Sequence, residues 1–377
     1  MKKNINLSLY IHIPWCLRRC PFCNFNIEIF KTKKKIVNKY IKNICNDLRQ
    51  DVKLIKKRKI YSIFIGGGTP TLLTYKEIYL MLRKISNIVK FNKKIEITIE
   101  MDPKTAKNEN IKFYKKIGIN RISIGVQTFE NKKLKFLRRM YNNKEVIKLI
   151  KYCKKDKNIK INIDIMHSLP NQTLYKALVD IKIAYKLNVD HISWYKLNIE
   201  KNTVFYKKKI KNCNEKISLK IFKYGNIILK KMGYKQYEIS SYSKKMCKSK
   251  HNLNYWNFGD YIGIGCGAHG KITIKNNTII RTIKQNNIKK YNSKNYLYKI
   301  KIIRKKEKIL EFFMNKFRLF KKTLITDFSN TTGICKNKIL KKIYMAEKEG
   351  YIKIKKNALK TTKKGIAFLD NLLEIFA

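Results

Sequence analysis

The first 200 residues alternate short apolar runs with longer stretches in which apolar residues recur every three or four positions. Short apolar runs predict buried strands, and the longer periodic stretches predict amphipathic helices. The predicted strands are Leu7–Ile13, Ile60–Ile65, Ile95–Glu100, Arg121–Val126, Ile159–Ile165 and His191–Tyr195. The clearest helical stretches between them are Val37–Leu54, Lys76–Val89, Lys132–Arg138 and Leu174–Leu187. This alternation predicts an α/β fold with a parallel sheet, although composition does not separate a partial barrel from a doubly wound sheet.

The rest of the chain shows a weaker pattern. We expect a helix over 215–232, short strands and turns at Glu238–Ser240 and Ile262–Ile280, and a Lys/Asn/Tyr-rich connecting segment over 283–308. Helical patterns follow at Ile309–Leu319, Lys336–Lys348 and Lys363–Phe376, with an alternating stretch before the last of them. The sequence therefore predicts a main domain over 1–282 and a small winged-helix-like domain over 309–377, joined by the segment 283–308.

The chain of 377 residues carries a formal net charge of +62. Only 11 of its 87 basic residues are arginine, and the lysines are spread along nearly the whole sequence. Recognition of phosphate groups favours clustered charge and more arginine, so we expect solvated faces and no specific nucleic acid partner. A radical enzyme or binder that acts on RNA stays an alternative, because of the high positive charge and the winged-helix-like tail.

No apolar stretch is long enough for a membrane span, and the residues from Met1 to Leu7 do not form a signal peptide. Nine cysteines, three of them clustered, are typical of a reducing compartment, so we expect a cytoplasmic protein.

The clustered cysteines are Cys16, Cys20 and Cys23, directly after the first predicted strand. Three soft thiolates favour an iron–sulfur cluster or zinc, and three ligands leave one coordination position open for chemistry. The spacing C-x3-C-x2-C is the signature of radical S-adenosylmethionine proteins.

Further motifs sharpen this resemblance. Tyr10-x-His12-x-Pro14 precedes the cysteine loop, the residues 251–256 read His-Asn-x-x-Tyr-Trp, and the stretches 233–240 and 258–270 continue the similarity. The chain thus resembles the haem chaperone branch of the anaerobic coproporphyrinogen III oxidase-like family, within the radical S-adenosylmethionine superfamily. The resemblance covers most of residues 7–282 and, more weakly, the tail. It implies an open six-unit (β/α) partial TIM barrel of the radical S-adenosylmethionine type, with a [4Fe–4S] cluster held by the three cysteines.

The resemblance also implies a binding site for S-adenosyl-L-methionine at the strand ends. The residues that match the family at this site are Tyr10, Phe22, Gly67, Gly68, Thr69, Glu100, Gln127, Arg139 and Asp164. Two positions depart from the family: His167-Ser168 stands where Tyr-Gly is usual, and Arg138 stands where glycine is common. We expect these departures to alter the geometry of the loops but not the set of ligands.

The motif at 251–256 implies haem as a further ligand, with His251, Asn252, Tyr255 and Trp256 as its candidate contacts. Cys266 and His269 compete with His251 as the axial ligand, and the sequence does not choose among them. The implied function is transfer of haem to an acceptor protein of unknown identity, with an unknown electron donor. Whether S-adenosylmethionine is cleaved or only controls the transfer stays open.

The alternative is an oxygen-independent coproporphyrinogen III dehydrogenase. Such enzymes carry a further cysteine two residues after the third cluster ligand, where this chain has Phe25, and they have an extension before the cluster loop. We therefore expect no coproporphyrinogen III dehydrogenase activity.

Overall fold

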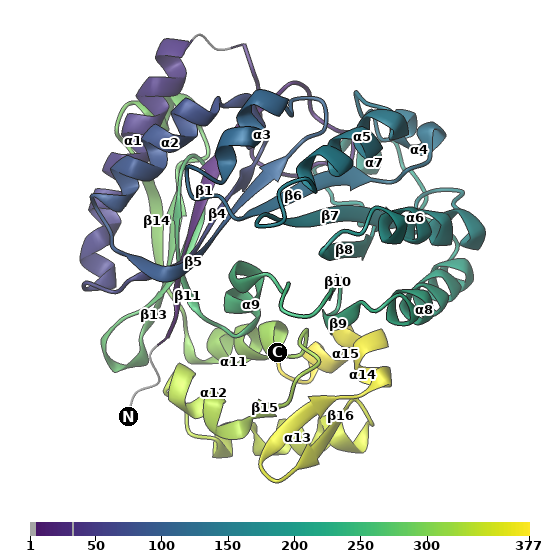
Figure 1. The fold of residues 1–377 in the computed structure, drawn as a ribbon. Coiled ribbons are helices and arrows are strands. Elements are labelled where there is room, and N and C mark those ends of the chain that lie inside the picture. The colour runs from purple at the N-terminus through teal and green to yellow at the C-terminus, as the bar shows by residue number, and fades with distance from the viewer. Residues whose placement is uncertain (1–4, 32–33) are drawn as a thin grey trace.

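The computed structural model describes residues 5–31 and 34–377. Its central feature is a parallel sheet made by the six predicted strands (Figure 1). They run in the spatial order β1 (Leu7–Ile13), β4 (Ile60–Gly67), β5 (Phe91–Met101), β6 (Arg121–Gln127), β7 (Lys160–His167) and β8 (His191–Lys196). This confirms the predicted α/β fold with a parallel sheet.

Helices connect and cover these strands. The connecting helices are α1 (Lys34–Ile55), α2 (Tyr75–Ser86), α3 (Asn108–Tyr114), α4 (Asn131–Phe136), α5 (Asn143–Cys153) and α6 (Leu174–Lys186), and α7 (Val204–Lys207) and α8 (Glu215–Lys231) follow β8. Helix α2 begins sharply because the Thr74 hydroxyl accepts from the Glu77 amide while the Glu77 carboxylate accepts from the Thr74 amide. Strand β1 lies in the middle of the sheet, and Leu9, Ile11 and Ile13 on it are fully buried. Burial of each such side chain stabilises the fold by about 1.5–3 kcal/mol.

The sheet extends beyond the parallel strands at both edges. Next to β1 it continues through β11 (Asp260–Ile264, parallel), β12 (His269–Thr273), β13 (Ile279–Lys284) and β14 (Leu297–Ile302), the last three antiparallel. Next to β8 it ends in β10 (Ser241–Ser243) and β9 (Lys235–Glu238). Ile239 and Ser240, in the region predicted as short strands and turns, form the turn between these two strands.

The segment 283–308 differs from the predicted connecting segment. It contains the end of β13, the helix α10 (Ile288–Asn292) and the strand β14, which pairs with β13 along its length. Strand β14 is an edge strand whose side chains after Leu297 are exposed, so it tolerates lysine and carries no burial pattern that reveals a strand. The large sheet therefore continues past residue 282, and the limits of the domains stay a proposal.

The tail has the predicted winged-helix-like form. It comprises α11 (Lys305–Lys316), β15 (Thr323–Leu324), α12 (Ile325–Thr332), α13 (Asn337–Lys348), β16 (Ile352–Lys355) and β17 (Ala358–Thr361), then α14 (Lys363–Ala367) and α15 (Leu369–Glu374). The prediction of one last helix over Lys363–Phe376 was wrong, because the backbone leaves helical geometry at Phe368. Its core is aromatic and includes Phe312, Phe313, Phe328 and Phe376.

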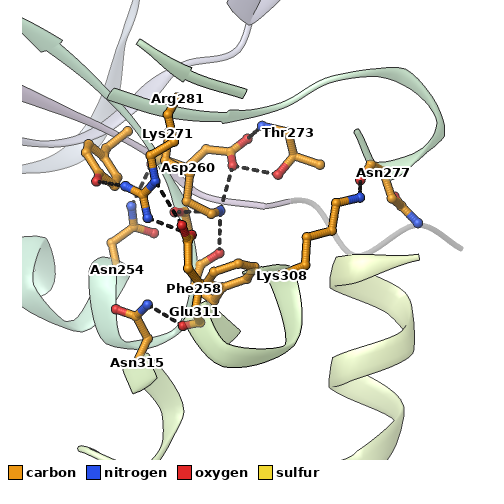
Figure 2. A network of polar contacts seen from close by, with 12 residues as sticks. Asn254, Phe258, Asp260, Lys271, Thr273, Asn277, Arg281, Lys308, Glu311 and Asn315 are labelled. Carbon is orange, nitrogen blue, oxygen red and sulfur yellow. Dashed lines mark hydrogen bonds and ion pairs between the residues drawn. The ribbon is translucent and has the colours of Figure 1, made fainter. Parts of the chain in front are cut away.

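Polar contacts attach the tail to the extended sheet (Figure 2). The Arg281 guanidinium on β13 pairs with Glu311 on α11 at 2.7 Å, and the Lys308 ammonium donates to the Asn277 carbonyl at 2.7 Å. Nearby, the buried Lys271 ammonium donates to the Phe258 carbonyl at 3.0 Å and lies 4.0 Å from the centre of the Phe258 ring. Phe258 and Ile279 also belong to the tail's apolar core, so the tail packs directly on this edge of the sheet. Within the described ranges, no helix is long and apolar enough to cross a membrane.

Candidate cofactor site

Three thiols lie where the central strand β1 ends. Cys16 belongs to the short strand β2 (Trp15–Cys16), which pairs with β3 (Glu28–Ile29), while Cys20 and Cys23 follow in the loop between them. All three line one cavity of about 580 Å³. Burial raises the pKa of Cys16 to about 11 and also raises the pKa of Cys23. These shifts favour the protonated form of Cys16 and Cys23, and a bound metal would supply the charge that releases the two protons.

The surroundings of the thiols suit thiolate ligands. The Thr69 hydroxyl donates to the Cys16 sulfur at 3.3 Å, and the Arg139 guanidinium donates to the Cys20 sulfur at 3.1 Å. Hydrogen-bond donors aimed at sulfur favour the anionic form and tune a metal bound to it. In the described part of the chain, no three His, Cys, Asp or Glu side chains gather tightly enough to hold a single metal ion. Three thiols around a shared cavity fit a four-iron cluster, whose thiolate ligands bind different irons.

The glycine loop at the end of β4 is locked against the cysteine loop. The Gly68 amide donates to the Ile13 carbonyl and the Thr69 amide donates to the Trp15 carbonyl, both at 2.7 Å. Gly67 has φ +106°, and a Cβ atom there would lie 2.5 Å from the His12 ring. Glycine alone adopts this left-handed backbone without strain and leaves room for the His12 ring, so no other residue type suits position 67.

Polar side chains from the next strand ends converge on the same cavity. The Glu100 carboxylate accepts from the Gly67 amide at 3.1 Å, and the Asp164 carboxylate accepts from Ser123 and Asn162, each at 2.9 Å. Burial, with a further contribution from Asp164, raises the pKa of Glu100 to about 8. Burial also raises the pKa of Asp164. Because the Glu100 and Asp164 carboxyl groups are buried close to each other, a positively charged ligand in this cavity would stabilise their ionised forms.

Arg139 reaches this cavity from the loop after α4. It pairs with Asp102 and donates to the Tyr141 hydroxyl at 2.8 Å. Gln127, at the end of β6 with φ +68°, accepts from the Tyr195 hydroxyl at 3.2 Å. Sequence patterns did not identify Asp102 as a site residue, although Asp102 directly follows β5 at the same edge of the sheet as Glu100. Its charge fixes the guanidinium that faces Cys20.

The two departures from the family pattern both keep a left-handed backbone. Ser168 has φ +56° and Arg138 has φ +53°, the region in which glycine is usual. The Ser168 hydroxyl compensates through hydrogen bonds with Ser218 at 2.7 Å and with the His167 ring at 3.0 Å. The Arg138 carbonyl accepts from the Arg18 guanidinium. The loops thus keep the conformation that glycine would allow, at the cost of local strain.

The structure brings most of the predicted S-adenosylmethionine residues into this first cavity. Those that line it together with the three cysteines are Phe22, Gly67, Gly68, Thr69, Glu100, Gln127, Arg139 and Asp164. Tyr10 does not: it lines an adjoining cavity of about 1010 Å³, and its hydroxyl bonds with the His12 ring at 3.0 Å. Any contribution of Tyr10 to the first cavity therefore passes through its neighbours.

The residues of the predicted haem motif form α9 (Lys250–Trp256), which begins at the N-cap Ser249. His251 is fully buried, and its ring nitrogens bond with the Ser62 hydroxyl at 3.0 Å and the Tyr255 hydroxyl at 2.9 Å. Burial lowers the pKa of His251 to about 3, so its imidazole is neutral. Both of its nitrogens already have partners inside the protein.

The other residues of the motif lie at the boundary of the second cavity. Tyr255 and Trp256 line this cavity, while Asn252 lines both cavities. The Arg318 guanidinium of the tail lies 4.4 Å from the centre of the Trp256 ring and pairs with the buried Glu238 at 3.3 Å. Cys266, a competing haem ligand, is buried.

Comparison with known proteins first gives the class of protein. The Radical SAM superfamily matches residues 10–181, and the HemN C-terminal domain matches residues 303–368. The fold is that of coproporphyrinogen III oxidase (HemN) from Escherichia coli, with a TM-score of 0.83 and 21% identity over 99% of this chain and 90% of the other. The fold is therefore that of a radical S-adenosylmethionine protein.

Similarity over the whole length then gives the family. The chain is 48% identical to the heme chaperone HemW of Buchnera aphidicola from Acyrthosiphon pisum and 40% identical to that of Escherichia coli K12. Each match covers 98% of this chain and 98% of the relative. The chain belongs to the HemW family of haem chaperones.

Proposed function

We propose that this chain is a haem chaperone that holds a [4Fe–4S] cluster and S-adenosylmethionine in the first cavity and binds haem as its cargo beside them. The observation that carries the proposal is the convergence of three thiols and the polar strand ends on one cavity. That cavity adjoins a larger one with aromatic walls, which holds most of the haem motif. Membership of the HemW family supports the same function.

Each group in the first cavity has a role that follows from its chemistry. Cys16, Cys20 and Cys23 would hold the cluster, which when bound offers one open iron and an electron to a sulfonium ligand. Glu100 and Asp164 would accept hydrogen bonds from the hydroxyl and ammonium groups of S-adenosylmethionine. The glycine loop lets backbone amide and carbonyl groups approach the ligand without a side chain in between.

The alternative, oxidative decarboxylation of coproporphyrinogen III, rests on the same fold. Phe25 stands at the position where the dehydrogenases carry a further cysteine. Its side chain is exposed and lines both cavities. A phenyl group cannot act as a further thiolate there, so the proposal does not include this activity.

The acceptor of the haem and the electron donor belong to the proposal only as classes: a haem-requiring protein and a one-electron reductant. We also infer that the chain works in the cytoplasm. All nine of its cysteines are free thiols in the structure, which supports a reducing compartment.

The test is anaerobic reconstitution of the full chain with iron and sulfide, followed by titration with haem. We expect a saturable Soret band at about one haem per chain, and no protoporphyrinogen when the same preparation receives coproporphyrinogen III, S-adenosylmethionine and a reductant. Absence of a Soret shift, or turnover of coproporphyrinogen III, would reject the proposal.

A further inference from the structure

The second cavity has a floor made by one face of the extended sheet. Tyr261 on β11, His269 and Lys271 on β12, and Arg281 and Ile283 on β13 all line it. These residues alternate along each strand, and the side chains of alternate residues point to the same face of a sheet. The floor is therefore a part of the rigid sheet.

The walls of this cavity are largely aromatic and flexible apolar side chains. Tyr255 and Trp256 contribute from α9, Met314 from α11 and Tyr298 from β14, while Phe25 lies where the cavity meets the first one. Tyr298 and Phe25 are exposed, although large apolar side chains are usually covered. A volume of about 1010 Å³ is at the upper end of the range for cavities that bind small molecules. A flat apolar macrocycle matches this size and chemistry.

A haem iron needs an axial ligand with a free lone pair, and histidine is the commonest one. The five histidines all lie in the described part of the chain, and four of them are buried: His12, His167, His191 and His251. His12 and His251, the buried ones that line the second cavity, use both ring nitrogens in bonds within the protein.

His269 differs from the other four. It is exposed at the start of β12, lines the cavity, and makes no side-chain hydrogen bond to any residue that the structure describes. Its ring nitrogens are therefore not engaged within the described part of the chain, and partial burial with the Arg281 charge lowers the pKa of His269, which favours the neutral imidazole that binds iron. The charge of Arg19 at the same cavity complements an anionic ligand such as a porphyrin with propionates, whereas the charge of Arg281 is already paired with Glu311.

We propose that haem binds in the second cavity with its iron on a ring nitrogen of His269, and that His251 supports the wall without touching the iron. This inference rests on the proposed function, since it names the site of the cargo. In this arrangement the motif at 251–256 shapes the cavity as part of α9, and the iron ligand comes from β12, outside the motif.

The test compares haem titrations of the full chain with those of His269→Ala and His251→Gln. We expect His269→Ala to weaken haem binding at least tenfold and to lose the spectrum of histidine-ligated haem, and free imidazole to restore that spectrum. His251→Gln keeps a polar side chain near Ser62, and we expect it to retain the histidine-ligated spectrum. The iron and sulfide content of each variant after reconstitution reports whether the first cavity is intact.

The outcomes separate this inference from the proposed function. If the unaltered chain binds no haem, the proposed function fails and this inference fails with it. If the unaltered chain and His269→Ala give the same spectrum and affinity, the inference is overturned while the function stands. Should His269→Ala fail to fold, His269→Cys decides: a thiolate-type spectrum supports ligation by residue 269, and an unchanged histidine-type spectrum overturns it.

Discussion

The two adjoining cavities are built in opposite ways. The first takes its polar groups from the carboxyl ends of neighbouring parallel strands, and nearly every one of them has a partner within the cavity, such as Thr69 with Cys16 or Glu100 with Gly67. The second takes its walls from α9, the neighbouring strands of the extended sheet, the cysteine loop near Phe25 and the tail. The first cavity is thus a property of the barrel, while Met314 and Asn315 of the tail complete the second.

The largest expected effect comes from removing one of the three thiols of the first cavity. Cys20→Ala removes one of three ligands, and we expect loss of the brown absorption near ~400 nm, because a cluster held by two thiolates is not retained. The matched control is Cys335→Ala, which removes an exposed thiol of the tail and should leave the absorption unchanged. Haem binding in the second cavity should survive Cys20→Ala. A Cys20→Ala protein that stays brown would refute this ligand.

A second substitution tests how tightly the first cavity is fixed. Gly67→Ala places a Cβ atom against the His12 ring in a left-handed backbone, whereas Gly233→Ala meets the same kind of backbone, φ +82°, with nothing within 4 Å. We expect Gly67→Ala to lower the free energy of unfolding by about 2 kcal/mol more than Gly233→Ala, because only the first adds a steric clash. Chemical denaturation measures both variants. Equal losses would mean that the clash is relieved by movement of His12.

A third substitution tests the dependence of the second cavity on the tail. Arg318→Ala leaves the buried Glu238 without its ion-pair partner and uncovers Trp256. We expect the free energy of unfolding to fall by about 1–3 kcal/mol and haem binding to weaken. Arg304→Ala breaks an ion pair that is exposed, and the expected loss is under about 0.5 kcal/mol. Haem titration that gives the same affinity for Arg318→Ala and the unaltered chain would contradict the claim that the tail completes this cavity.

A fourth test concerns the dependence of stability on pH. Glu100 has a pKa raised from 4.5 to about 8, so the folded chain holds this proton more tightly than the unfolded chain does. The contribution of Glu100 to stability should therefore fall as the pH rises from about 4.5 to about 8, and should level off above that. Glu100→Gln lacks this proton and should remove that part of the slope when unfolding is measured without cofactors. An identical slope in both proteins would show that Glu100 is already charged.

Much of the barrel and of the first cavity could be predicted from the sequence, for a physical reason. Buried parallel strands are continuous apolar runs, so the pattern located all six, and residues that follow strands must meet at one edge. Asp102 was missed because a single acidic residue after a strand carries no signal until Arg139 is seen beside it. The strand β14 was missed because an exposed edge strand shows no burial pattern.

The second cavity could not be predicted, because its residues come together only through tertiary packing. The sequence singled out His251 within a conspicuous motif, yet the structure surrounds that ring with Ser62 and Tyr255. Burial and the occupancy of ring nitrogens are not visible in one sequence. For that reason His251, Cys266 and His269 stayed equivalent until the fold distinguished them.

The most direct test of the account is to ask whether one chain carries both groups at once. The full chain would be reconstituted anaerobically, loaded with haem, freed of excess reagents, and analysed for non-haem iron, acid-labile sulfide, zinc and haem in the same sample. The account predicts about four non-haem irons, about four sulfides and about one haem per chain. Zinc in place of iron and sulfide, or release of haem whenever the cluster is formed, would contradict two neighbouring sites with separate ligands.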